Sequence, residues 1–205
     1  MEAIKLQLAT KTLLNPAARQ WERAPRVNLA LRGTEAAEQP SAYVRTAWAG
    51  KQVGSIRALA VQAANNRQSL FFRLEWRDNT PDVSYGDGSV FPDAAAVLFP
   101  ANGDAPLERM GAPAQGIESW YWRANREEYG ECLRLHGLAT EEPQTGVTVT
   151  TSAHHQDGRW QVVISGPLAT SGVPPRVAFA VWDGSNQERA GLHSYSPEWL
   201  ELVLS

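Results

Sequence analysis

The stretch from Val177 to Ser205 reads VAFAVWDGSNQERAGLHSYSPEWLELVLS. Its first six residues, Val177–Trp182, form an apolar run that predicts a strand buried on both faces. Turn-forming residues follow from Asp183, and the alternation of apolar residues from Trp199 to Leu204 predicts a second strand. His193 lies alone in the loop between them. A side chain held between two strands is positioned in advance, as a ligand or catalytic group must be.

Working outward, the sequence contains further short strands separated by turn residues. The clearest is Leu70–Trp76, which places Leu70, Phe72, Leu74 and Trp76 on one face. The other expected strands are Glu2–Thr12, Val27–Leu31, Val53–Ala63, Ala94–Phe99, Trp120–Ala124, Val147–Ala153 and Trp160–Ser165. The last two flank Asp157-Gly158, which is typical of a tight hairpin turn. Only two helical segments are expected, one turn after Asn15-Pro16 and a short helix over Arg126–Leu135. This pattern predicts a mainly β, single-domain β-sandwich over residues 1–205, of the immunoglobulin-like two-sheet type.

Composition limits the classes of function. The 205 residues carry a net charge of −3, which argues against a nucleic-acid partner or a membrane-surface partner. No run reaches the roughly 18 apolar residues that a membrane-spanning helix needs, so no membrane insertion is expected. The single cysteine, Cys132, excludes an intrachain disulfide and the C-x-x-C-H motif of covalent haem attachment. Eight tryptophans indicate large apolar contacts, in a core, a cofactor pocket or an interface.

Three blocks of sequence resemble one known family. They are Phe72–Asp78 (FRLEWRD) with Phe91–Ala94 (FPDA), Arg109–Gly111 (RMG) with Ser119–Asn125 (SWYWRAN), and Ala180–Ser194 (AVWDGSNQERAGLHS). In this order they resemble the haem b-binding gamma subunit of the ethylbenzene dehydrogenase, dimethylsulfide dehydrogenase and chlorate reductase type of molybdenum enzymes. The resemblance covers roughly residue 70 to the end, and the first 50 residues match only loosely.

The resemblance implies one haem b held between two axial ligands, Met110 and His193. Without it, a lone methionine is a core filler and a lone loop histidine is solvated. The family has lysine where this chain has His193, and neutral imidazole is the better nitrogen ligand at neutral pH because a lysine amine must first lose its proton. His154 or His155 is the reserve ligand. Trp120 and Trp122 are expected either to line the cofactor or to pack in the core.

The implied function is electron transfer rather than catalysis, and no nucleophile–base set or phosphate-binding loop is visible in the sequence. The implied partners are a molybdenum catalytic subunit and an iron–sulfur subunit in a heterotrimer, with a soluble cytochrome as the external carrier. The start of the chain lacks a signal-peptide core, which alone favours the cytoplasm. The resemblance instead implies a periplasmic protein exported folded with a signal-bearing partner. Two alternatives stay open: a tryptophan-rich carbohydrate-binding module, and a haemless structural subunit of the same complex.

Overall fold

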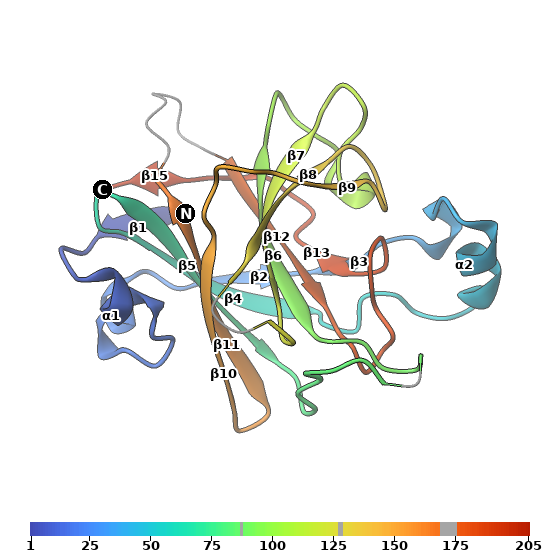
Figure 1. Ribbon diagram of the computed structural model, residues 1–205, viewed down its shortest axis with the longest axis horizontal. Coiled ribbons are helices and arrows are strands. Elements are labelled where there is room, and N and C mark those ends of the chain that lie inside the picture. Colours follow the sequence, from blue (N-terminus) through green and yellow to red (C-terminus); the bar gives the residue numbers. More distant parts are fainter. Residues whose placement is uncertain (87, 127–128, 169–175) are drawn as a thin grey trace.

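The computed structural model describes residues 1–86, 88–126, 129–168 and 176–205. Two β-sheets form the body of the molecule, and the short helices lie at its ends (Figure 1). The mainly β sandwich predicted from the sequence is therefore confirmed. In these four ranges no helix has both the length and the apolar character needed to cross a membrane.

The first sheet has seven strands in the order β10-β11-β5-β4-β1-β15, and β2 pairs with β4 beside β1. Its strands are β1 (Glu2–Lys5), β2 (Val27–Ala30), β4 (Ala58–Asn65), β5 (Ser69–Arg77), β10 (Thr150–Gln156), β11 (Arg159–Pro167) and β15 (Val203–Leu204). The Asp157-Gly158 turn joins β10 and β11 with both residues at positive φ, as a tight hairpin requires.

The second sheet has eight strands in the order β3-β13-β12-β6-β7-β8-β9, and β14 pairs with β12. Its strands are β3 (Arg32–Gly33), β6 (Ala94–Pro100), β7 (Ile117–Arg123), β8 (Glu131–Leu135), β9 (Glu141–Pro143), β12 (Arg176–Trp182), β13 (Ser194–Tyr195) and β14 (Leu200–Glu201). The described helices are α1 (Thr10–Leu14) and α2 (Ala42–Ala47), with 3-10 turns at Arg19–Arg23, Ala36–Glu38 and Leu107–Arg109.

The main core lies between the two sheets. The predicted inner face of β5 contributes Leu70, Phe72, Leu74 and Trp76 to it, all nearly or fully buried. The outer face of the first sheet is covered by α1 and the turn that follows, where Leu13 and Trp21 pack on Phe71. The outer face of the second sheet carries a separate apolar cluster with small side chains at its centre: Ala94, Ala96, Ala178 and Ala180. Met110, one of the two implied axial ligands, packs in this second cluster.

Two predicted elements were wrong. The helix over Arg126–Leu135 is instead the strand β8 over its last five residues, because pairing with β7 and β9 outweighs local helix propensity; residues 127 and 128 lie outside the described part. The turn predicted after Asn15 is present: the Ala18 N–H donates to the Asn15 carbonyl oxygen at 3.1 Å and the Ala17 N–H to Asn15 Oδ1 at 3.0 Å, directly after α1.

The strand predicted over Trp199–Leu204 is split. β14 pairs with β12 in the second sheet, whereas β15 pairs with β1 in the first. Leu202, fully buried between them, marks the crossing from one sheet to the other.

Two glycines allow a close backbone crossing next to β3. A Cβ on Gly54, which has φ +80, would clash with the backbone of Gly33, and a Cβ on Gly33 would clash with the Val53 carbonyl group. This crossing brings the 53–55 segment against the loop that follows β12. Gly50 offers a control, because it has φ +77 and nothing within 4 Å of an added Cβ.

We expect Gly54→Ala to lower the free energy of unfolding by clearly more than Gly50→Ala. Both variants bear the left-handed backbone strain of about 1–2 kcal/mol, and only Gly54→Ala adds the clash. Denaturant unfolding curves of the two variants measure the difference. Equal losses would contradict the close crossing.

Candidate functional site

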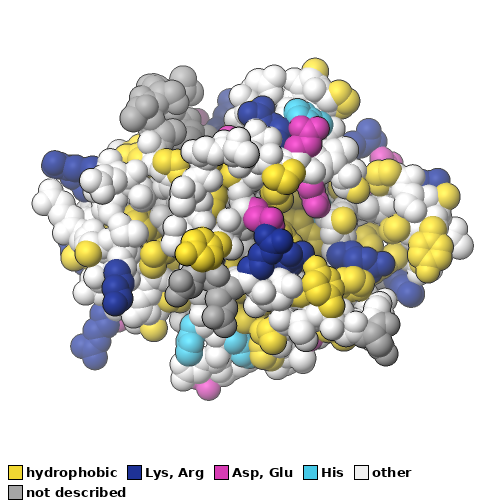
Figure 2. All heavy atoms as spheres, in the orientation of Figure 1, with side chains coloured by type: hydrophobic (Ala, Val, Ile, Leu, Met, Phe, Trp, Pro, Cys, Tyr) yellow, Lys and Arg dark blue, Asp and Glu magenta, His cyan; other side chains and the backbone are white. Residues whose placement is uncertain are grey.

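A cleft lies on the outer side of the second sheet, between β7–β9 and the loop that follows β12. Its wide part has a volume of about 320 Å³, with Tyr121, Leu133 and Trp182 in its wall. Its narrow end encloses about 20 Å³ and is lined by the same three residues and by Met110. Figure 2 shows hydrophobic side chains in a hollow near the middle of the molecule, with acidic and basic side chains around it. We call the wide part and the narrow end together the outer cleft.

Met110 is held in an unusual backbone conformation at the narrow end. It has φ 53 and ψ 46, in the left-handed region that non-glycine residues seldom adopt. Its N–H donates to the Leu107 carbonyl oxygen at 3.1 Å, and its carbonyl oxygen accepts from the Gly137 N–H at 3.1 Å. The side chain is buried. Such a strained, doubly fixed position is typical of a functional side chain.

His193 is fully buried immediately before β13. Its backbone is fixed by Thr34, whose N–H donates to the His193 carbonyl oxygen at 2.9 Å. Burial lowers the pKa of the imidazole to about 4, so the ring is neutral at pH 7. The interpretation of a solvated loop histidine is therefore wrong.

The tautomer of His193 follows from its hydrogen bond. Nδ1 lies 3.2 Å from the Ala190 carbonyl oxygen, and because a carbonyl group only accepts, Nδ1 carries the proton. Nε2 therefore keeps its lone pair, and it is buried without a hydrogen-bond partner in the described part of the chain. A neutral imidazole whose second nitrogen is fixed by a backbone carbonyl group is the usual form of a metal-ligating histidine.

The Trp182 indole lies near both predicted ligands, although His193 does not itself line the outer cleft. Its ring centroid lies 4.8 Å from that of His193 and 5.4 Å from that of Tyr121. It also lines the narrow end of the outer cleft with Met110. Met110 and His193, 83 positions apart in the sequence, therefore both lie beside one indole on the same side of the second sheet.

Two arginines lie at the wide part of the outer cleft. The Arg189 guanidinium lies 4.2 Å from the centroid of the Phe91 ring. Arg123 donates to the Tyr85 hydroxyl group at 2.7 Å, and its Nε is buried without a partner among the described residues. Both cations are thus available to an anionic group that enters the cleft.

Glu188 fixes the loop that carries His193. It is 1% exposed, and its carboxylate accepts four hydrogen bonds, from the N–H groups of Gly54, Ser55 and Asp183 and from the Asn186 side chain, at 2.7–3.1 Å. Burial raises the pKa of Glu188, and these hydrogen bonds oppose the rise. This residue lies within the quoted Ala180–Ser194 block, although the sequence alone did not identify it as buried.

The tryptophans predicted to line a cofactor lie elsewhere. Trp120 and Trp122 point to the opposite side of β7 from Tyr121 and pack in the core between the sheets, where Trp122 contacts Trp76 and Trp160. Both side chains therefore pack in the core, which was the alternative prediction for them. They do not line the outer cleft.

The reserve ligands are also distant from Met110. His154 and His155 lie on β10, in the first sheet. His154 is exposed, and the His155 Nε2 lies 2.8 Å from the Asp78 carbonyl oxygen. His136, which was not a predicted ligand, precedes Gly137 near Met110, and its Nε2 lies 4.0 Å from the Glu142 carboxylate.

Comparison with known proteins supports the family resemblance, and the match of the family model includes the first two quoted blocks but ends before the third, Ala180–Ser194. The family model described as ethylbenzene dehydrogenase matches residues 18–141. The chain is 34% identical to the chlorate reductase subunit gamma of Ideonella dechloratans, over 96% of this chain and 82% of that one. It is also 34% identical to a putative respiratory nitrate reductase heme subunit of Haloferax mediterranei, over 90% of this chain and 66% of that one. Dimethylsulfide dehydrogenase subunit gamma of Rhodovulum sulfidophilum is 32% identical over 69% and 58% of the respective chains.

Solved structures share the fold at much lower identity. A family 9 carbohydrate binding module from Caldicellulosiruptor kristjanssonii, in complex with glucose, superposes with a TM-score of 0.55 at 8% identity, over 100% of this chain and 95% of that one. A putative carbohydrate-binding protein from Bacteroides uniformis gives 0.54 at 11% identity, over 100% and 98%. These two similarities concern the sandwich alone. The sequence relatives and the matching family model place the chain itself in the ethylbenzene dehydrogenase family.

Proposed function

We propose that this chain is an electron-transfer subunit that binds one non-covalent b-type haem, with Met110 and His193 as the axial ligands. The buried, unpartnered Nε2 of His193 carries the proposal. A buried nitrogen lone pair without a partner costs free energy unless a ligand takes it up, and haem iron is such a ligand. The relative from Haloferax mediterranei is named a heme subunit, which supports the same cofactor.

The donor set fits a haem used for electron transfer. A thioether and a neutral imidazole are the axial pair that raises the potential of haem iron in electron carriers, and two ligands leave no open position for a substrate. When bound, the haem would accept and release one electron at a time. The chain's own contribution is to hold both donors on fixed backbone and to surround them with apolar side chains.

The outer cleft supplies the remaining features of a haem site. The volume of its wide part, about 320 Å³, lies at the lower limit for cofactor sites, and its narrow end is too small for a porphyrin as it stands. A shift of the Trp182 indole or of the Met110 loop would join the two parts. Arg123 and Arg189 are suited to bind the two haem propionates as charge-assisted pairs.

The proposed setting is a complex of several subunits. Two relatives are gamma subunits, of chlorate reductase and of dimethylsulfide dehydrogenase, and this chain is likewise a subunit without its own catalytic centre. We propose a molybdenum catalytic subunit and an iron–sulfur subunit as its partners, and a soluble cytochrome as the external carrier. The proposed location is the periplasm, after export in the folded state with a signal-bearing partner.

The carbohydrate-binding alternative has less support. A tryptophan platform for a sugar needs exposed indole rings, whereas seven of the eight tryptophans are buried and Trp199 is partly buried with its Nε1 donating to the Ala105 carbonyl oxygen. The haemless alternative predicts no spectrum in the visible range. Both alternatives therefore predict a colourless protein.

Full extraction of the haem into acidified organic solvent is the first expected outcome. Cys132 is the chain's only cysteine, and it packs in the core between the sheets, away from the outer cleft. No thioether link to a haem in this cleft is therefore available. Haem that stayed with the polypeptide after extraction would contradict the b-type assignment.

Substitution of the two ligands should have different effects. We expect His193→Ala to weaken haem retention at least about tenfold, or about 1.4 kcal/mol, because it removes the stronger donor. Met110→Ala should retain more haem and lower the reduction potential, because the thioether is the softer ligand. His193→Lys should largely restore binding, since it recreates the lysine that the family resemblance implies.

Retention is measured by absorbance of the reconstituted protein, and the potential by redox titration. His154→Ala is the matched control, because this exposed histidine lies on β10, in the other sheet. An unaltered low-spin spectrum in His193→Ala, together with its loss in His154→Ala or His155→Ala, would overturn the axial assignment.

The partners can be tested by co-expression. Obligate interfaces bury roughly 2,000 Å² or more, so the chain alone should self-associate or be poorly soluble. We expect this chain to co-purify in a fixed ratio with an iron–sulfur subunit when the two are co-expressed. That subunit is taken from the complex of a relative that has a gamma subunit. A well-behaved monomer without affinity for that subunit would count against the proposed complex.

A further inference from the structure

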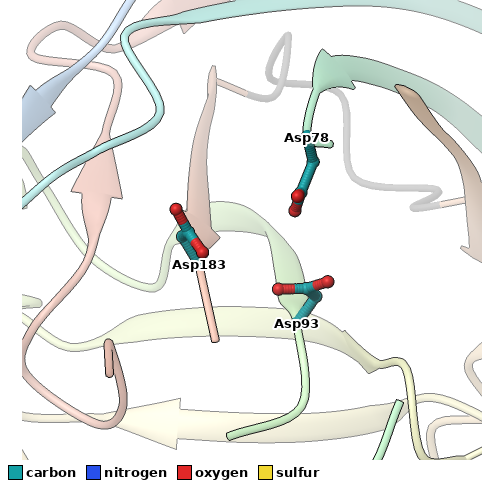
Figure 3. A group of neighbouring side chains, drawn as sticks. All are labelled: Asp78, Asp93 and Asp183. Carbon is teal, nitrogen blue, oxygen red and sulfur yellow. The ribbon is translucent and has the colours of Figure 1, made fainter. Parts of the chain in front are cut away.

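Three aspartates meet at one end of the sandwich, outside the outer cleft. Asp78 follows β5 of the first sheet, whereas Asp93 precedes β6 and Asp183 follows β12 in the second sheet. One carboxylate oxygen of each lies within 4.8 Å of the others. Figure 3 shows the Asp78 carboxylate pointing toward Asp93, with Asp183 beside the gap between them. We call these three residues the aspartate cluster.

No basic side chain neutralises the cluster. Asp93 is fully buried and Asp78 is 7% exposed, yet neither they nor Asp183 form an ion pair with a basic group in the described ranges. The nearest histidine, His155, contacts the Asp78 carbonyl oxygen rather than its carboxylate. Buried carboxylates at this spacing repel one another unless a cation or a proton lies between them.

One oxygen in the cluster lacks a partner. Asp78 Oδ1 accepts from the Thr80 N–H at 3.0 Å, but Asp78 Oδ2 is buried without a hydrogen-bond donor among the described residues. Asp93, by contrast, accepts from the N–H groups of Gly184 and Asp82 and from the Trp160 indole at 2.8–2.9 Å. These donors hold both Asp93 oxygens in place and still leave lone pairs on them. Asp78 Oδ2 therefore lacks a donor and lies near other carboxylate oxygens, which are acceptors as well.

We propose that the aspartate cluster binds one calcium ion. Calcium–oxygen distances of about 2.3–2.6 Å place two oxygens on one ion at most about 5 Å apart, which the 4.8 Å limit satisfies. The donors are all oxygens and come from three separate segments. Calcium accepts such irregular sets, whereas magnesium requires near-octahedral geometry. Water or bidentate binding would complete the six to eight ligands.

Bound calcium would fasten the two sheets together at this end. Asp183 begins the loop that carries Glu188 and His193, so the ion would also anchor the first residue of that loop to β5 and β6. The cluster lies on separate residues from Met110 and His193. The calcium proposal can therefore fail or succeed independently of the haem proposal.

Terbium luminescence tests the site in the full chain after chelator treatment. The Trp160 Nε1 lies 2.9 Å from Asp93 Oδ2, so its indole is close enough to sensitise a terbium ion in the cluster. We expect saturable emission under tryptophan excitation, displaced by calcium at lower concentration than by magnesium. Asp78→Asn and Asp183→Asn should each weaken terbium binding at least about tenfold.

The control is Glu198→Gln, which removes one exposed carboxylate elsewhere on the surface and should leave terbium binding unchanged. Calcium should raise the Tm of the wild-type protein and of this control but not of Asp78→Asn, which keeps the oxygen that caps Thr80. If Asp78→Asn does not fold, Asp183→Asn is used for the same Tm measurement, because Asp183 is partly exposed.

The competing explanation is that bound protons, rather than a calcium ion, neutralise the cluster. Burial raises the pKa of Asp93 to about 7 and raises that of Asp78. If calcium leaves the wild-type Tm unchanged and Asp78→Asn raises it, the cluster shares protons and the calcium proposal fails. Terbium emission of equal strength in Asp78→Asn, Asp183→Asn and the wild type would also overturn it. Displacement by magnesium as readily as by calcium would contradict the choice of ion.

Discussion

The buried carboxylate of Glu188 is the interaction on which the functional end of the molecule depends. It accepts hydrogen bonds from backbone on both sides, from Gly54 and Ser55 and from Asp183 in its own loop. The loop from Asp183 to His193 is thereby fixed against the 53–55 segment. Asp183 begins this loop in the aspartate cluster, and His193 ends it beside Trp182. A polar loop thus presents one side chain to each of the two proposed metal sites.

The two faces of the second sheet have different roles: the inner face forms the core, and the outer face carries the proposed haem site. Its inner face packs tryptophan and phenylalanine side chains against the first sheet, whereas its outer face carries alanines and the outer cleft. Carbohydrate-binding modules share the same sandwich at 8–11% identity, so the fold alone does not specify the ligand. In the proposed haem site of this chain, the specificity would come from the loops over the outer face, above all from the positions of Met110 and His193.

Much of the fold could be predicted from the sequence, because β5, β12 and the β10–β11 hairpin carry strong alternation or turn signals. β8 was missed because pairing on both of its edges, not local propensity, makes it a strand. The strand periodicity predicted that Trp120 and Trp122 lie on one face of β7 and Tyr121 on the other. It did not predict which of these faces packs in the core. The three aspartates of the cluster each lie in a quoted block, Phe72–Asp78, Phe91–Ala94 or Ala180–Ser194, but the sequence does not show that they meet in space. Met110 and His193 were found through family resemblance; their burial and the free Nε2 required the structure.

The central claim is a haem held by one sulfur and one nitrogen ligand. The most direct measurement is magnetic circular dichroism of the ferric protein, purified with its partners, in the near-infrared, where the two axial ligands determine the charge-transfer band. The account predicts a single low-spin species with the band of methionine–histidine ligation, and loss of that band in Met110→Ala. A colourless protein, or a ferric spectrum without a methionine band in the wild type, would contradict the account.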